Sequence, residues 1–366
     1  MRIDGTPIGV EEGVYYIAEA GVNHNGDIEI AKKLIDAAAD AGADAVKLQT
    51  FSADDLVVES APKAEYQKQH TDESQYEMLQ KYELDRAEHE ELLDHAEECS
   101  VTLLSTPCDG ESVRLLDELD RPAIKIGSGD LNNHPMLEQI AVAGRPMIVS
   151  TGMSTMPEVE RAVEVIREAN PDVPLALLHC TSEYPTAVED VNLRAMERMA
   201  EQFSVPVGHS DHTTAVETPA MAVAAGACIV EKHFTLGRRL PGPDHEASLE
   251  PDELRESVRF ARASALARGS SVKRPTAGEW TTRTRVRKSL HTSRELSPGE
   301  SLSRADLTVV RPADGLPPGA LDRVVGRTVT ERVEREAPVT ADVVEGDIDL
   351  SGLPSLDVDR REQTDE

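Results

Sequence analysis

At 366 residues, 39% hydrophobic and 29% charged, the chain has the size and composition of a globular protein with a substantial core. Its net charge of −30 excludes binding to nucleic acid or to an anionic membrane through bulk charge. The sequence contains neither an apolar run of about 18 residues nor the apolar core of a signal peptide at its start. We therefore expect a cytoplasmic protein.

Short apolar runs typical of buried strands alternate along the chain with stretches of helical length. The strand candidates are Tyr15–Ala18, Ala45–Leu48, Thr102–Ser105, Ala123–Ile126, Met147–Ser150, Leu175–His179, Val205–Val207 and Cys228–Val230. The helix candidates are Ile28–Ala41, Ala87–Cys99, Ser112–Glu118, Met156–Ala169, Leu193–Gln202, Thr214–Ala225 and Pro251–Ala267. A polar segment, residues 61–82, separates the second strand from the third, and we expect a loop with a short helix there.

This alternation predicts an α/β protein whose residues 1–268 form a (β/α)8 TIM barrel, the catalytic domain. Strands that alternate with helices pair in parallel, and eight such units in about 270 residues favour a closed barrel over an open sheet. A doubly wound sheet is the alternative fold. It usually carries a Gly-rich phosphate loop after its first strand, and Gly21–Gly26 does not match that fingerprint.

The pattern changes after Gly269. Residues 269–286 contain Gly, Ser and Pro and are interpreted as a linker. Residues 287–350 contain short β-like pieces interrupted by Pro-Gly turns, which predicts a small β-rich domain. The tail, residues 351–366, is polar and acidic, and we expect it to be disordered.

Two features of the composition bear on the environment of the protein. The acidic residues are spread over the whole chain, which we interpret as a surface adapted to a cytoplasm of high salt, where screening weakens self-repulsion. An ordinary acidic enzyme with an acidic tail is the alternative. The four cysteines, Cys99, Cys108, Cys180 and Cys228, show no CxxC spacing, and we expect buried free thiols with neither disulfides nor a zinc site.

Polar, reactive side chains follow the predicted strands, at the end where barrel enzymes have their active sites. They are Glu19, Lys47, Gln49, Lys125, Ser128, Asp130, Ser150, Ser182, Tyr184, Ser210, His212, Glu231 and His233. Lysines and small hydroxyls beside glycines suit a phosphate, which needs charge-assisted donors and a close backbone. Taken singly, such a serine is more often a helix N-cap and such a lysine a surface residue. Together they predict an anion site.

His212 and His233 come at the ends of two neighbouring strands, close enough to share one divalent transition metal with open coordination positions. A lone histidine at a strand end is more often structural, but two on adjacent strands beside a phosphate site favour metal binding. Such an ion can orient a phosphate and polarise a carbonyl on a second substrate. Four carboxylates are candidates for acid–base chemistry or for binding sugar hydroxyls: Glu19, Asp130, Glu231 and Asp244.

Eight runs carry these residues in a fixed order: residues 17–26, 46–51, 125–130, 150–153, 179–185, 210–213, 231–235 and 240–245. These runs resemble the N-acetylneuraminate (sialic acid) synthase family, and the resemblance covers residues 10–350. On the runs 287–290 and 307–312, the C-terminal domain is similar to the antifreeze-like (SAF) domain of that family. The resemblance implies a transferase that condenses phosphoenolpyruvate with an N-acetylated hexosamine in its open-chain aldehyde form. The products are phosphate and a nine-carbon 2-keto acid, a sialic acid.

The resemblance also implies roles for single residues. His212 and His233 would bind Mn2+, with Mg2+ or Co2+ as alternatives, and the ion would activate the aldehyde oxygen. Phosphoenolpyruvate would be held by Lys47, Lys125, Ser128, Ser150, Ser182 and Ser210. The sugar would be held near the metal by Glu19, Gln49, Tyr184 and Asp244, with Glu231 as a further substrate-binding residue. Arg311 would reach the acyl group of sugar bound in the partner subunit of a domain-swapped homodimer.

The chain departs from the family pattern at two positions. The family has a glutamate after Gly-Ser-Gly, where it steadies positive charge at C2 of phosphoenolpyruvate and activates the water that adds there. This chain has Asp130 at that place, which is one methylene shorter. Ser182 stands where some members carry Asn.

The acceptor sugar stays open. N-acetylmannosamine is the first expectation, and a diacetamido trideoxyhexose of legionaminic or pseudaminic type and a phosphorylated mannosamine are alternatives. A 3-deoxy-heptulosonate-type synthase shares the barrel chemistry but does not need the C-terminal domain. A non-catalytic carbohydrate-binding or ice-binding protein is an alternative of another class. A binder has no use for a metal beside a phosphate site, so the residues at the strand ends argue against it.

Overall fold

The computed structural model describes residues 1–61 and 74–353. The chain divides into two compact units, Met1–Gly269 and the part that begins at Ser270. The predicted polar segment, residues 61–82, lies partly outside the described residues, and so does most of the predicted disordered tail. Within the described ranges, no helix is both long and apolar enough to cross a membrane.

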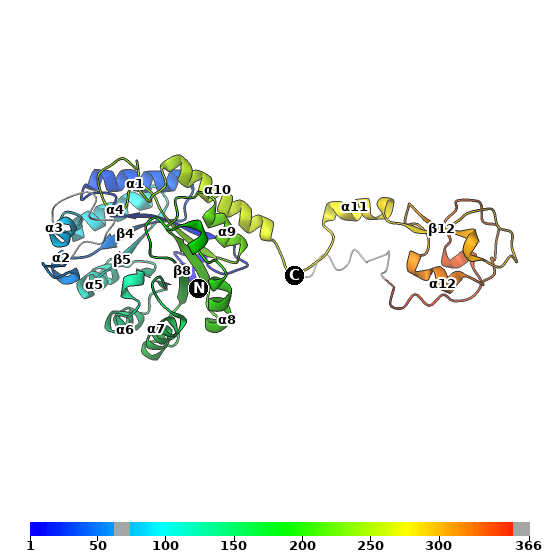
Figure 1. The fold of residues 1–366 in the computed structure, drawn as a ribbon, viewed down its shortest axis with the longest axis horizontal. Helices are drawn as coiled ribbons and strands as arrows, with labels where there is room; N and C mark the ends of the chain where they lie inside the picture. The colour runs from blue at the N-terminus through cyan, green and yellow to red at the C-terminus, as the bar shows by residue number, and fades with distance from the viewer. Residues whose placement is uncertain (62–73, 354–366) are drawn as a thin grey trace. The chain divides into compact units, whose positions relative to one another are not determined.

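Unit one contains a sheet of eight parallel strands that curls into a barrel (Figure 1). The strands are β3 (Tyr15–Gly21), β4 (Ala45–Thr50), β5 (Thr102–Pro107), β6 (Ile124–Ile126), β7 (Met147–Ser150), β8 (Leu175–Cys180), β9 (Val207–Asp211) and β10 (Ile229–His233). Their hydrogen-bonded order is β5-β4-β3-β10-β9-β8-β7-β6, and β5 packs against β6 where the barrel closes. The predicted (β/α)8 barrel is confirmed.

Helices surround the barrel on its outside (Figure 1). They are α1 (Ile28–Ala41), α4 (Arg86–Glu98), α5 (Gly110–Glu118), α6 (His134–Ala143), α7 (Met156–Ala169), α8 (Ala195–Phe203), α9 (Thr218–Ala224) and α10 (Pro251–Arg268). Two short helices, α2 (Ala53–Leu56) and α3 (Gln75–Gln80), lie between β4 and α4. The helix expected from Thr214 begins at Thr218, because Asp211 and Thr213 organise the residues before it into a turn.

Helix α6 is absent from the sequence prediction. Its first turn contains Pro135, which suits the start of a helix because proline lacks the N–H that would go unpaired there. Met136, Leu137, Ile140 and Ala141 then repeat with helical spacing and are buried. Because these signals lie in a short segment between a Gly-rich loop and a strand, the sequence pattern did not predict the helix.

Strand alternation divides the barrel interior into layers. Successive side chains of a strand point to opposite faces, so on β3 the outward Tyr16 and Ala18 pack against helices and the inward Tyr15 and Ile17 fill the barrel. The next inward position on β3 is Glu19, which is buried. The lower layer is therefore apolar, and the layer above it, toward the C-terminal ends of the strands, is charged.

A hairpin that the sequence prediction did not include precedes the barrel. Strands β1 (Arg2–Ile3) and β2 (Thr6–Pro7) pair antiparallel, and Ile3 and Ile8 are buried against the lower apolar layer. This hairpin closes the end of the barrel opposite the charged layer, so the charged end is the one available to a ligand.

Unit two begins with helix α11 (Ala277–Val286), which lies in the predicted linker. Strands β11 (Ser289–Thr292) and β12 (Leu307–Val310) pair antiparallel, and isolated bridges join further extended pieces. A short helix, α12 (Leu321–Val324), and a core that includes Leu290, Leu302 and Val339 complete the unit.

Candidate active site

The C-terminal ends of the strands open onto a cavity of about 730 Å³. Its lining contains these residues expected from the sequence: Glu19, Lys47, Gln49, Lys125, Ser128, Asp130, Ser150, Ser182, Tyr184, Ser210, His212, Glu231 and His233. Asp244 lines an adjoining pocket of about 110 Å³ that also contains Gln49, Tyr184 and His233. Arg311 belongs to unit two, where its side chain is exposed.

Four buried charges form the floor of the cavity. The strand register places Glu19 beside Lys47, whose Nζ lies 2.6 Å from Glu19 Oε2 and 3.6 Å from Glu231 Oε2. Lys125 Nζ lies 3.2 Å from Glu231 Oε1, and that same oxygen accepts a 2.8 Å hydrogen bond from Ser210 Oγ. The two lysines and two glutamates balance one another in charge, which makes their burial tolerable.

Burial and pairing together set the charge states of this floor. Burial alone would raise the pKa of Glu231, but Lys125, Lys47 and the Ser210 hydrogen bond lower it, so Glu231 stays ionised. Burial raises the pKa of Glu19 in spite of Lys47, and the negative charge of Glu231 adds to the effect. Glu19 is therefore the floor carboxyl that more readily takes up a proton near neutral pH, as a general acid or base must.

Hydroxyl groups gather around Gly152 on one side of the cavity. Ser128 Oγ accepts a 3.0 Å hydrogen bond from Gly152 N. A methyl group at residue 152 would collide with Ser182 Oγ and lie 2.8 Å from Ser128 Oγ, so only glycine lets these hydroxyls converge. Ser150 Oγ is buried and has no hydrogen-bond partner in the described part of the chain. Together with Lys125 these groups form a cradle of donors suited to an anion.

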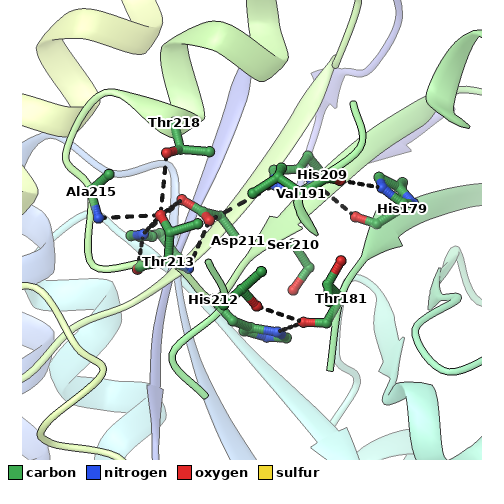
Figure 2. A network of polar contacts seen from close by, with 12 residues as sticks. His179, Thr181, Val191, His209, Ser210, Asp211, His212, Thr213, Ala215 and Thr218 are labelled. Atoms are coloured by element: carbon green, nitrogen blue, oxygen red, sulfur yellow. Dashed lines mark hydrogen bonds and ion pairs between the residues drawn. The ribbon is translucent and has the colours of Figure 1, made fainter. Parts of the chain in front are cut away.

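The two histidines lie together in the same cavity. His212 follows β9 directly and His233 ends β10, and their ring centroids are 5.5 Å apart. His212 Nδ1 is 2.6 Å from the carbonyl oxygen of Thr181, so it carries the proton and leaves Nε2 available as a ligand (Figure 2). His233 Nδ1 is buried without a hydrogen-bond partner within the described ranges.

This pair fits a divalent metal. Burial lowers the pKa of both His212 and His233, and for His233 the nearby His212 and Lys47 lower it further. Both rings are therefore neutral at neutral pH, which is the form that binds metals. Tyr184 packs on His212 with a centroid distance of 4.1 Å and limits the movement of its ring. The pair supplies two ligands and leaves further coordination positions for substrate oxygens.

A second buried ion pair lies on the outward face of the same strands. Lys232 is fully buried, and its Nζ lies 2.6 Å from Asp211 Oδ2 and also donates to the carbonyl oxygen of Thr213. Asp211 Oδ1 accepts a 2.9 Å hydrogen bond from the Thr213 amide, and Thr213 Oγ1 contacts Thr218 Oγ1 at 3.2 Å (Figure 2). This network holds the turn that follows β9, and His212 lies within that turn.

Two aspartates complete the polar lining. Burial raises the pKa of Asp130, and a 3.3 Å hydrogen bond from Asn133 opposes this effect. Burial raises the pKa of Asp244 to about 6 although Lys47 lowers it. Asp244 and Glu19 both approach Gly21, where the lack of a side chain leaves them room. Asp244 is thus placed between the charged floor and the small adjoining pocket.

Several lining residues have no assigned role in the sequence prediction of the site. Thr106 accepts a 2.8 Å hydrogen bond from Lys47 Nζ, and its place at the end of β5 could have identified it. Cys108, Met153 and Glu183 also line the cavity. The adjoining pocket has an apolar wall of Val22, Met78, Leu79 and Tyr82. Met78 and Leu79 belong to α3, which is distant in sequence from most other residues of this pocket. No local sequence pattern therefore predicts their place in it.

The fold and the site together define a TIM-barrel protein with an anion cradle and a two-histidine site in one cavity. Residues 34–273 match the NeuB family and residues 287–345 match the SAF domain. The chain belongs to the NeuB family, and the resemblance found in the sequence is confirmed.

Relatives with known products match over nearly the whole chain. An N,N'-diacetyllegionaminic acid synthase of Campylobacter jejuni is 44% identical over 87% of this chain and 97% of its own length. One of Legionella pneumophila is 43% identical over 89% of this chain and 93% of its own. The crystal structure of an N-acetylneuraminic acid synthetase from Leptospira borgpetersenii, in complex with citrate, is 32% identical with a TM-score of 0.69, covering 77% of this chain and 94% of that one.

Proposed function

We propose that this protein condenses phosphoenolpyruvate with a diacetamido trideoxyhexose and water to give a legionaminic-type nonulosonic acid and phosphate. The observation that carries the proposal is that the anion cradle and the two histidines face one cavity, so a phosphate-bearing nucleophile and a metal-bound aldehyde would meet there. The relatives at 43% and 44% identity favour this acceptor over N-acetylmannosamine, our first expectation from the sequence.

The anion cradle suits phosphoenolpyruvate. Lys125 and the hydroxyls of Ser128, Ser150 and Ser182 would bind its two anionic groups, with Ser210 and Lys47 completing the set. Lys47 and Lys125 already pair with buried glutamates. An arriving anion would therefore compete with those carboxylates, and the lysines need not be desolvated again when the ligand binds.

A divalent ion on His212 and His233, for which we propose Mn2+, would supply Lewis acidity toward the aldehyde oxygen of the acceptor. Carbon 3 of phosphoenolpyruvate forms the new bond to the aldehyde carbon, which leaves positive charge at carbon 2. Asp130 would face that charge and take a proton from the water that adds at carbon 2. The tetrahedral centre then expels phosphate by cleavage of the carbon–oxygen bond. Glu19, with its raised pKa, would provide the proton for the new hydroxyl.

The adjoining pocket supports a deoxygenated acceptor. Its wall of Val22, Met78, Leu79 and Tyr82 is apolar and meets the site at His233 and Tyr184. A methyl group at the end of a trideoxy sugar loses little when it leaves water for such a wall, whereas a hydroxymethyl or phosphate group loses its hydration. Asp244 and Gln49, at the edge of that pocket, would bind the sugar hydroxyls.

The remaining parts of the proposal concern unit two and the environment. We propose that Arg311 contacts the acyl group of sugar bound by the partner in a domain-swapped homodimer. The exposed side chain of Arg311 is consistent with such a contact. In that case Arg311→Ala raises the KM for the sugar about tenfold while the KM for phosphoenolpyruvate stays unchanged, and equal effects on both would contradict the role. We also propose that the acidic surface is an adaptation to high salt.

A phosphate-release assay with a panel of acceptors tests the function. Purified full-length protein is incubated with phosphoenolpyruvate, Mn2+ and one of three sugars: a diacetamido trideoxyhexose, N-acetylmannosamine or its phosphorylated form. We expect the highest kcat/KM with the diacetamido sugar. A higher kcat/KM with N-acetylmannosamine would identify that sugar as the acceptor, as first expected from the sequence. Sugar binding without phosphate release from any acceptor would favour a non-catalytic binder.

A further inference from the structure

A group of metal-ligating side chains lies on the outer wall of the barrel, away from the cavity residues. Asp36 of α1, His95 of α4 and Cys99, which directly follows α4, place one ligand atom each within 4.8 Å of the other two. Within the described ranges, no other group of three or more His, Cys, Asp or Glu side chains meets that criterion. Asp36 is exposed, and His95 and Cys99 are half-buried.

The helices account for this convergence. His95 is in the last turn of α4 and Cys99 follows one turn later, so both side chains lie on the same face of the helix. Helix α1 packs against that face, and Asp36 is in its middle. The three ligands thus come from two packed helices. The absence of CxxC spacing, on which the expectation of no zinc site was based, does not bear on a site of this kind.

The distances resemble the edges of a tetrahedral zinc site. Asp36 Oδ1 lies 2.8 Å from His95 Nε2 and 3.3 Å from Cys99 Sγ, and the sulfur is 3.7 Å from the same nitrogen. Bonds of about 2.0 to 2.3 Å at tetrahedral angles put such atoms about 3.3 to 3.6 Å apart. Shifts of about half an ångström would therefore bring all three atoms onto one ion.

The charges around the thiol also favour a cation. The carboxylates of Asp36, Glu98 and Asp40 surround Cys99, and each would repel a thiolate. A divalent cation reverses that repulsion. On binding, the thiol proton leaves to solvent, and the proton on His95 Nε2 moves to Nδ1 so that Nε2 can act as a ligand.

We propose that Asp36, His95 and Cys99 form a zinc site that ties α1 to α4 on the outer wall of the barrel. A thiolate, an imidazole and a carboxylate form a mixed set that Zn2+ accepts, with water in the fourth position, and the soft thiolate favours Zn2+ over Mg2+ and Mn2+. The site joins the helix that follows β3 to the helix that precedes β5, so its effect is on stability. It does not depend on the reaction proposed above.

Cobalt, which substitutes for zinc and reports thiolate ligation, tests the site. Metal-free full-length protein is titrated with Co2+, and the thiolate-to-cobalt charge-transfer band in the near ultraviolet is recorded. We expect the band in the wild type and in Cys108→Ser, whose thiol lies at the active-site cavity, and its loss in Cys99→Ser and His95→Gln. Far-ultraviolet circular dichroism verifies that each variant is folded.

Thermal unfolding provides a second readout that does not require cobalt. Bound Zn2+ stabilises the folded state by mass action, so Zn2+ should raise the Tm of the wild type and of Cys108→Ser by more than that of Cys99→Ser, in which only the two histidines of the cavity can bind the ion. A charge-transfer band that persists in Cys99→Ser, or a wild type that shows no band and no Tm shift, would overturn the proposal. A band that disappears in Cys108→Ser instead would assign the thiolate to the active-site cavity and would also overturn it.

Discussion

Buried lysine–carboxylate pairs lie on both faces of the strands that form the candidate site. The two groups differ in how completely the protein itself surrounds and hydrogen-bonds them. On the outward face, Lys232 Nζ contacts Asp211 and both oxygens of Thr213, and the side chain is fully enclosed. On the inward face, Lys47 and Lys125 share two glutamates beside an open cavity.

Within the described ranges, several buried polar atoms at the cavity lack a hydrogen-bond partner. Ser150 Oγ, Glu231 Oε2 and His233 Nδ1 are buried without a hydrogen-bond partner in the described part of the chain. An unsatisfied buried polar group costs about 1–3 kcal/mol, so a fold does not retain several of them in one place without a use. The outward pair is enclosed by its own partners, which suits a structural role, whereas the inward groups are free to contact the substrate and the metal proposed above.

The largest effect is expected from His212→Ala, which removes a proposed metal ligand from the cavity. Loss of Lewis acidity worth several kcal/mol should lower metal-dependent phosphate release roughly 1,000-fold or more. His209→Asn is the matched control, because His209 is a buried histidine on the outward side of the same strand. Wild-type rates in His212→Ala, measured after chelation and Mn2+ addition, would refute the metal assignment.

Lys232→Met tests the outward face. It leaves Asp211 buried without its cation, which should lower the free energy of unfolding by about 3–5 kcal/mol. Because the turn that carries His212 depends on this network, metal affinity should fall as well, while the affinity for phosphoenolpyruvate changes less. The double variant Lys232→Met/Asp211→Asn should regain part of the stability in urea unfolding. A single variant as stable as the wild type would show that the outward pair is not structural.

Gly152→Ala probes the anion cradle without removing any polar group. The added methyl collides with Ser182 Oγ and lies 2.7 Å from Cys180 Sγ, so the hydroxyls around it must move apart. Displacement of that size can cost about 100-fold, and we expect this loss in kcat/KM for phosphoenolpyruvate with a smaller change for the sugar. Gly278→Ala in α11 is the control, because Gly278 is outside the cavity and the space around it is open. Unchanged kinetics in Gly152→Ala would contradict the placement of the cradle.

Asp244→Asn tests whether a buried carboxyl group at the candidate site lowers the stability of the fold. The pKa of Asp244 is raised to about 6, so the folded state binds the proton more tightly than the unfolded state. This contribution to stability is complete below about pH 4 and is lost as the pH rises through 6. The variant should therefore be more stable than the wild type by about 3 kcal/mol at pH 8, equally stable at acid pH, and weaker in binding sugar. If the variant and the wild type are equally stable at both pH values, burial does not destabilise the ionised form of Asp244.

Much of the site was accessible from sequence because barrel geometry is regular. Once strands are located, their C-terminal ends meet at one rim, and this rule brought Glu19, Lys125, His212 and residues on the other strands together. The strands themselves were recognisable by their continuous apolar runs. Helix α6 was overlooked because its ten residues follow a Gly-rich loop with little polar contrast.

What sequence reasoning could not supply depends on contacts between distant segments. Met78 and Leu79 reach the small adjoining pocket from α3, and the rule that strand ends meet at one rim does not locate that helix. Asp36, His95 and Cys99 meet only because α1 packs on α4. Lys232 and Glu231 are adjacent in sequence but point to opposite faces of β10. Lys232 pairs with Asp211 on the outward face, whereas Glu231 contacts Ser210 at the cavity.

The fate of the bridging oxygen of phosphoenolpyruvate tests the central claim most directly. In the proposed reaction water adds at carbon 2 and phosphate leaves by carbon–oxygen cleavage. Phosphoenolpyruvate labelled with oxygen-18 at the bridging position should therefore transfer its label to the released phosphate, in the presence of acceptor sugar and metal. Mass spectrometry of phosphate and of the nonulosonic acid measures both outcomes. Label retained in the 2-keto acid, or labelled phosphate released without acceptor, would contradict the account.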